Sequence, residues 1–99
     1  MILVRDIFTL KFGKAREAIA CLQEGMPTLK SLGQGTGTRL LTDLVGDYYT
    51  LVMESTYESL TEYENTGKTM MKDSRWKEWY QKFVPLAEGG RREIFNVIQ

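Results

Sequence analysis

Residues 38–57 read TRLLTDLVGDYYTLVMESTY, two runs of apolar and β-branched residues separated by Gly46-Asp47. This pattern predicts a β-hairpin with strands at 38–45 and 48–57, because a Gly-Asp pair suits a tight two-residue turn. The turn fixes a register in which Arg39 faces Glu54 and Leu41 faces Val52. One face then carries Arg39, Leu41, Asp43, Val45, Tyr48, Thr50, Val52 and Glu54, and the other carries Leu40, Thr42, Leu44, Tyr49, Leu51 and Met53. The second face is the drier one, and we expect it to pack under helices.

The segments on either side of the hairpin alternate between strand and helix patterns. Residues 2–11 are rich in apolar and β-branched side chains and predict a strand. From Lys14 onwards, apolar residues recur at helical spacing, which predicts an amphipathic helix, and Pro27 predicts a kink or break near Gly25 to Met26. After the hairpin, Ser59 begins a capping-box pattern for a second helical region, although Ser55 fits the same pattern.

A further helical segment is predicted to begin at Asp73 or Ser74. Gly89-Gly90 is expected to end it, and residues 91–98 return to a strand pattern. The order is therefore strand, helix, strand, strand, helix, strand. In 99 residues, this order predicts one α+β domain over residues 1–99 with a ferredoxin-like βαββαβ fold. Its four-stranded antiparallel sheet would carry two helical layers on one face.

The sheet face that the helices leave uncovered predicts an assembly. A solvated face should be dominated by charged residues, whereas this one includes Leu41, Val45, Tyr48 and Val52. Two copies paired face to face would bury these side chains in a closed or nearly closed barrel. We therefore expect a homodimer, a dimeric α/β barrel, with a semi-polar cavity between the two sheets.

The composition excludes several classes of protein. Thirteen basic and thirteen acidic residues give a net charge of zero, without the positive surplus that a nucleic-acid binder needs. The chain has no histidine and a single cysteine, Cys21, so neither a metal site nor a bound cofactor nor an internal disulfide is expected. Arg5 and Asp6 interrupt the apolar start that a signal peptide needs, and no uncharged run approaches the ~20 residues that cross a bilayer. We expect a cytoplasmic protein with no membrane contact.

Three short motifs occur in an order shared with a known family. Residues 8–14, FTLKFGK, resemble the strand-to-helix junction of the NIPSNAP-like proteins in the dimeric α/β-barrel superfamily. Residues 54–60, ESTYESL, resemble the family's second such junction, and residues 76–79, WKEW, followed by Pro85-Leu86, are similar to its late helix. The resemblance spans nearly the whole chain. It implies the barrel dimer more firmly than an activity, since many members of this group have no assigned reaction.

Three carboxylates are candidates for chemistry. Asp6, Asp43 and Glu54 could approach one another inside a barrel, where a desolvated carboxylate can act as a base. Asp43 and Glu54 are therefore the candidate catalytic residues. The favoured interpretation is structural, with Arg39 paired to Glu54 across the hairpin.

Aromatic side chains complete the predicted ligand site. Trp76 lies on a helix that could close the mouth of the barrel, and Phe8 and Tyr48 could contact a flat apolar ligand from the sheet. The predicted ligand-binding residues are Asp6, Phe8, Arg39, Asp43, Tyr48, Glu54 and Trp76. Most of the aromatic residues on the late helix are expected to pack in the core.

Three functions remain open from the sequence. The first is binding of a small apolar or aromatic molecule in the cavity between the sheets. The second is a cofactor-independent monooxygenase or isomerase of a small aromatic compound, with Asp43 or Glu54 activating the substrate and Trp76, Tyr48 or Asn96 positioning it. The third is a structural or protein-interaction module with a filled interior.

Overall fold

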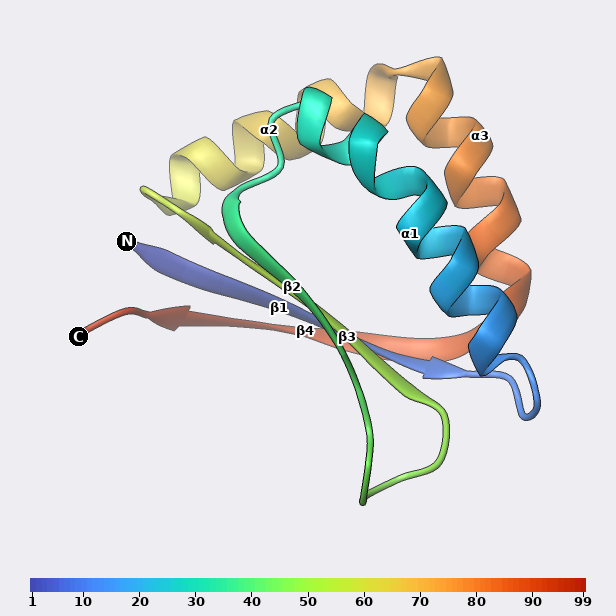
Figure 1. Cartoon of the computed structure of the whole chain (residues 1–99). Helices are drawn as coiled ribbons and strands as arrows, with labels where there is room; N and C mark the ends of the chain where they lie inside the picture. The colour runs from blue at the N-terminus through green and yellow to red at the C-terminus, as the bar shows by residue number, and fades with distance from the viewer.

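A computed structural model describes residues 1–99 and confirms the predicted α+β, ferredoxin-like fold. The elements follow the chain as β1 (Ile2–Leu10), α1 (Ala15–Ser31), β2 (Thr36–Thr42), β3 (Thr50–Tyr57), α2 (Leu60–Lys72), α3 (Ser74–Phe83), the single 3₁₀ turn η1 (Val84–Leu86) and β4 (Ala87–Asn96). The strands form one antiparallel sheet in the order β2-β3-β1-β4. All three helices lie over one face of this twisted sheet, and the other face is open (Figure 1).

The core lies between the sheet and the helices. Leu22 of α1 and Leu51 of β3 are fully buried there. Around them pack Leu10, Ala18, Leu29 and Phe83, with half-buried Leu40, Tyr49 and Met53 at the margin. Leu40, Tyr49, Leu51 and Met53 all belong to the drier hairpin face, so the prediction that this face packs under the helices is confirmed. Leu44, from the same predicted face, is instead almost fully exposed.

The hairpin has the predicted register and a different turn. Arg39 pairs with Glu54 and Leu41 with Val52, the register expected from the position of Gly46-Asp47. The last pair joins Thr42 to Leu51 and β3 begins at Thr50, so a seven-residue connection replaces the two-residue turn at Gly46-Asp47, and the prediction of that turn is wrong. The connection begins where Asp43 Oδ1 accepts a hydrogen bond from the Thr50 amide at 2.8 Å. In Figure 1 it extends beyond the sheet, away from the helices.

Helix boundaries follow local capping with two corrections. Ser59 Oγ accepts a hydrogen bond from the Glu62 amide at 3.2 Å and begins α2, and Asp73 caps α3. Helix α1 runs through Pro27 without a break. Pro27 has no amide hydrogen to donate to the Gln23 carbonyl, but both residues are exposed, so water can satisfy that carbonyl. Gly89-Gly90 does not end α3, which stops at Phe83. Both glycines lie inside β4, and a Cβ atom added at Gly90 would overlap the Ile7 carbonyl oxygen.

The contact between α1 and α3 requires a glycine. A Cβ atom at Gly25 of α1 would overlap the Trp79 indole. The indole cannot retreat easily, because Trp79 Nε1 donates a hydrogen bond to the Cys21 carbonyl at 2.9 Å and its rings stack on Phe83 at 5.3 Å. Gly25 therefore sets how closely the two helices approach.

We expect Gly25→Ala to lower the free energy of unfolding by about 1–2 kcal/mol. Overpacking costs about 1–3 kcal/mol, which exceeds the gain of about 1 kcal/mol from replacing a helical glycine. Gly67→Ala in α2 is the matched control, because nothing lies within 4 Å of its added Cβ; this variant should be stabilised. Urea unfolding measures both variants, and equal stabilisation by the two substitutions would contradict the close α1–α3 contact.

Candidate functional site

The predicted ligand-binding residues lie in three places rather than one. Arg39 and Glu54 pair across the hairpin on the open face of the sheet. Asp6 and Phe8 of β1 point to the opposite face, where they line a cavity together with Trp76 of α3. Asp43 and Tyr48 belong to the exposed connection between β2 and β3. Strand geometry therefore separates Asp6 from Glu54, and the predicted approach of three carboxylates does not occur.

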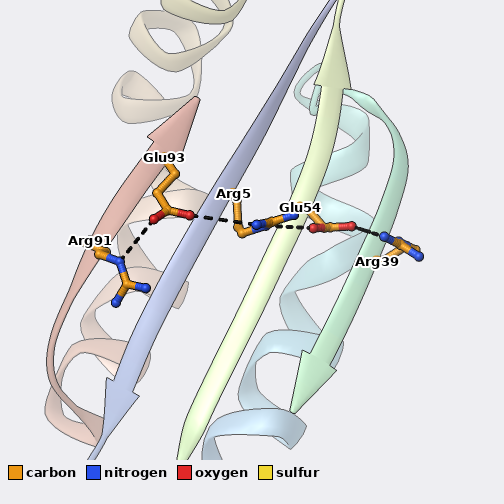
Figure 2. Close-up of polar contacts among 5 residues, drawn as sticks. All are labelled: Arg5, Arg39, Glu54, Arg91 and Glu93. Carbon is orange, nitrogen blue, oxygen red and sulfur yellow. Dashed lines mark hydrogen bonds and ion pairs between the residues drawn. The ribbon is translucent and has the colours of Figure 1, made fainter. Parts of the chain in front are cut away.

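A row of charged side chains crosses the open face of all four strands (Figure 2). This charge row consists, in spatial order, of Arg91, Glu93, Arg5, Glu54 and Arg39. At its centre, Arg5 Nε lies 3.0 Å from Glu54 Oε2, and Arg39 Nε lies 2.9 Å from Glu54 Oε1. Towards β4 the contacts are longer: Arg5 Nη1 lies 3.8 Å and Arg91 Nε 3.4 Å from the two oxygens of Glu93. Positive and negative charges alternate along the row, so each charge in it has an oppositely charged neighbour, and three arginines against two glutamates leave the row with a net charge of +1.

Glu54 is the buried member of the charge row. Its side chain is only 2% exposed, whereas that of Arg39 is 68% exposed. The hydrogen bond from Arg39, and after it the one from Arg5, holds the pKa of the Glu54 carboxyl below its ordinary value, although burial acts in the opposite direction. A carboxylate held this way stays ionised and accepts protons poorly at neutral pH, which favours the structural interpretation of Glu54.

The second candidate acid, Asp43, also has a structural contact. One of its carboxylate oxygens accepts the Thr50 amide hydrogen bond that begins the connection to β3. Tyr48, in the same connection, is 79% exposed and lies with Phe12 and Tyr49 in an aromatic group at its base. Neither Asp43 nor Tyr48 lines the cavity on the helix side.

The other face of the sheet encloses a cavity of about 290 Å³ beneath α2 and α3. We call it the helix-side cavity. Eleven of its sixteen lining residues are hydrophobic. They are Asp6, Phe8, Leu29, Gln34, Met53, Tyr57, Tyr63, Thr66, Gly67, Met70, Met71, Trp76, Trp79, Tyr80, Phe83 and Arg92. A shallower groove along β4 shares Asp6, Phe8, Tyr80, Phe83 and Arg92 with it, so the cavity opens to solvent on that side.

Aromatic rings form the helix wall of the cavity. Trp76 stacks on Tyr80 with ring centres 4.7 Å apart, and Phe83 meets Phe8 edge-on at 5.0 Å. These contacts come from the helical spacing of residues 76, 80 and 83, which places them on neighbouring turns of α3. Trp76 and Phe8 thus line the same cavity, but on the helix side of the sheet and not in the space between two sheets, where a flat ligand was expected to contact them.

Polar groups gather at the sheet side of the cavity. Arg92 Nε donates to Asp6 Oδ1 at 2.5 Å, and the Arg92 guanidinium lies 5.6 Å from the centre of the Tyr63 ring. Burial raises the pKa of Tyr57 and of Tyr63, so both phenols remain protonated at neutral pH. The site therefore combines a neutralised ion pair with neutral hydroxyl groups.

Sequence reasoning missed Gln34, Tyr57, Tyr63 and Arg92. Tyr63 belongs to the apolar stripe of α2, so its burial could have been anticipated. Arg92 enters the site only because β4 pairs with β1 in the register Asp6 to Arg92, which no local pattern predicts. Asn96 is exposed at the end of β4, opposite Ile2 and outside the cavity.

Neither a metal cluster nor a membrane-spanning helix is present. No three His, Cys, Asp or Glu side chains lie close enough together to hold a metal ion. None of the helices combines the length and the apolar character needed to cross a bilayer. Burial raises the pKa of the Cys21 thiol, which keeps it protonated.

An antiparallel sheet with helices on one face and a cavity beneath them defines this chain as a ferredoxin-like α+β protein, with the fold of the antibiotic biosynthesis monooxygenases. One solved structure of such a monooxygenase has a TM-score of 0.76 at 9% identity and covers 100% of both chains. The NIPSNAP family model matches residues 5–96, and the chain belongs to this family.

Two solved NIPSNAP structures are closely similar in fold. An uncharacterized NIPSNAP domain protein from Burkholderia xenovorans has a TM-score of 0.86 at 17% identity, covering 98% of this chain and 94% of that one. A NIPSNAP family protein of unknown function from Agrobacterium tumefaciens has a TM-score of 0.87 at 24% identity, covering 96% and 86%. A comparison with curated proteins found no match.

Proposed function

We propose that this protein binds a small, flat, largely apolar molecule in the helix-side cavity. The observation that supports it best is a cavity of about 290 Å³ with aromatic walls and a few convergent polar groups, which is typical of ligand sites. This location differs from the expected one between two sheets. A space between sheets exists only in a dimer, and ligand binding there stays a prediction.

We expect naphthalene derivatives to bind wild-type protein and quench its tryptophan fluorescence. The chain has only two tryptophans, Trp76 and Trp79, and both line the cavity, so the intrinsic signal reports on its contents. Gly67→Leu should weaken binding at least tenfold, because Gly67 lines the cavity and has open space where a side chain would be added. Leu60→Phe, on the exposed start of α2, is the control and should bind as wild type does. If no naphthalene derivative quenches the tryptophan fluorescence, the proposed ligand binding is wrong.

A second candidate is oxygenation or isomerisation of a small aromatic compound by Asp43 or Glu54, outside the helix-side cavity. It is favoured by the fold shared with a protein described as an antibiotic biosynthesis monooxygenase. Oxygen uptake with a panel of hydroquinones and naphthols tests it. An unchanged rate in an Asp43→Asn, Glu54→Gln double variant would remove these two carboxylates from the mechanism. If nothing binds or reacts, the third candidate, a structural or protein-interaction module, is favoured.

The proposed partner is a second copy of the chain, paired through the open sheet face. Ile7, Val52 and Leu41 form an apolar row beside the charge row, and Leu41 is 40% exposed in one chain. Pairing within the sheet lowers the cost of burying the charge row, and the one net positive charge of each copy is best placed on Arg39, whose side chain is 68% exposed. With a single half-buried cysteine and no bilayer-crossing helix, we also propose a cytoplasmic location.

Sedimentation at micromolar concentration should report a species of twice 11.4 kDa. Leu41→Glu is expected to shift the population to monomer, because it places a new charge without a partner in the paired face. Leu60→Glu puts the same charge on an exposed site of α2 and should leave the dimer unchanged. A wild-type protein that sediments only at the single-chain mass would overturn the pairing.

A further inference from the structure

We infer that the helix-side cavity selects ligands that carry a neutral hydrogen-bond donor, which the side-chain oxygen of Gln34 accepts. This inference rests on the proposed ligand-binding function. It begins from the observation that Gln34 Oε1 is buried and has no hydrogen-bond partner. Buried acceptors are nearly always paired, because removal from water without a new partner carries a large desolvation cost. An acceptor left in this state on a cavity wall points to a group that arrives with the ligand.

The backbone around Gln34 is fixed by the end of α1. Gly33 takes the left-handed conformation, with φ 96°, that a helix-ending turn requires. The Gly33 amide donates to the Lys30 carbonyl at 3.2 Å, and the Gln34 amide donates to the Leu29 carbonyl at 3.1 Å. This paired turn leaves the Gln34 side chain beside the sheet rather than on a mobile loop.

The direction of the side-chain amide follows from its other contact. Gln34 Nε2 donates to Met53 Sδ on β3 at 3.2 Å. The reversed amide would place oxygen against sulfur, and neither atom can donate. The nitrogen is therefore committed to the sheet, and the oxygen is the unpaired, water-shielded atom of a side chain that lines the cavity.

The surroundings of Gln34 define the chemistry of the ligand group. A recess of about 20 Å³ joins Gln34 to Tyr57, Tyr63 and Asp6. Arg92 neutralises Asp6, and burial raises the pKa of both phenols, so the recess presents no free charge. A cationic or anionic group would find no counter-charge there. A hydroxyl on an aromatic ring suits it, since the ring lies against Trp76 and the hydroxyl donates to Gln34 Oε1.

Titration of tryptophan fluorescence with 1-naphthol and with 1-methoxynaphthalene tests this inference. The two probes share a ring system, and only the first can donate a hydrogen bond. Wild-type protein should bind 1-naphthol about tenfold or more tightly than 1-methoxynaphthalene. Gln34→Met keeps the length of the side chain and removes the acceptor, so this preference should fall to about onefold. Binding of 1-methoxynaphthalene should be unchanged, which shows that the variant remains folded. Gln23→Met, on the exposed side of α1, should retain the full preference.

Three other outcomes of these titrations would contradict the inference, each for a different reason. Equal binding of the two probes by wild type would mean that a water in the recess, which has room for one, already satisfies Gln34 Oε1. The ligand-binding proposal would then stand without the specificity. A preference that survives Gln34→Met would assign the hydroxyl to another group. If neither probe binds, the proposed function itself fails, and the inference fails with it.

Discussion

Replacing Phe83 with alanine is expected to lower the free energy of unfolding by about 4 kcal/mol and the melting temperature by at least 15 °C. The side chain is 3% exposed at the end of α3, where it stacks on Trp79 and meets Phe8 of β1 edge-on. Truncation of a buried phenylalanine costs about 3–5 kcal/mol, and a domain of this size has about 5–15 kcal/mol in total. Each kcal/mol corresponds to about 4–8 °C in so small a domain. Thermal unfolding followed by circular dichroism measures the change.

Tyr80→Ala is the matched control on the same helix. Tyr80 is 47% exposed and stacks on Trp76 at the rim of the cavity, so its loss should cost about 1 kcal/mol. The comparison separates the aromatic contacts that hold α3 to the sheet from those that only line the opening. Equal losses in the two variants would show that Phe83 is not the residue that joins α3 to β1.

The register of the hairpin was predictable from the position of Gly46-Asp47 between its two apolar runs. The strand pairs, from Arg39 with Glu54 to Thr42 with Leu51, are centred on these two residues, so the structure has the predicted register although its connection is longer. The length of the turn was not predictable, because Gly46-Asp47 satisfies a local rule that a longer-range contact overrides. The Asp43 carboxylate accepts a hydrogen bond from the Thr50 amide, and β2 ends at Thr42, three residues before the predicted end at residue 45.

The orientation of β1 could not be read from its sequence. Apolar residues occur at both even and odd positions of residues 2–10, since both faces of this inner strand carry them. The even positions carry four apolar residues and the odd positions two, but Asp6 interrupts the even set, so this pattern alone did not decide whether Arg5 or Asp6 faces the helices. Pairing with both β3 and β4 decides the question: Arg5 lies beside Glu54 on the open face, and Asp6 lies beside Arg92 under the helices.

The sequence therefore indicated part of the lining of the helix-side cavity and not its location. Phe8 and Trp76, expected as aromatic contacts for a ligand, both line the cavity on the helix side of the sheet rather than a space between two sheets. Gln34 was not identified, because its importance depends on an unpaired atom in the folded cavity, and the sequence places it in a glycine-rich loop that predicts only flexibility. Contacts between β1 and β4, distant in the chain, define the rest.

Replacing both Arg5 and Arg39 with methionine is expected to lower the free energy of unfolding by about 3 kcal/mol at pH 7. Methionine keeps the long stems that cover Glu54, so its carboxylate remains buried while both charged partners are lost. An unpaired buried charge costs about 3–5 kcal/mol, whereas an apolar replacement of the whole cluster is often neutral. Adding Glu54→Leu to the double variant should therefore restore stability to within about 1 kcal/mol of wild type. Arg91→Met is the control, because its contact with the partly exposed Glu93 should contribute at most about 1 kcal/mol.

The pH dependence of unfolding should reverse sign between wild type and the double variant. In wild type the arginines lower the pKa of Glu54, so its contribution is fully present above about pH 4.3, the ordinary glutamate value, and is lost as the pH falls through the lowered pKa. Without the arginines, burial alone acts and raises that pKa. Acidification then neutralises an unpaired charge, and the double variant should gain stability relative to wild type between pH 7 and 4. Urea unfolding across this range measures the difference, and a constant gap between the two proteins would show that Glu54 is not held by its arginines. If the triple variant (Arg5→Met, Arg39→Met, Glu54→Leu) remains as unstable as the double variant, the loss of stability does not come from an unpaired carboxylate at Glu54.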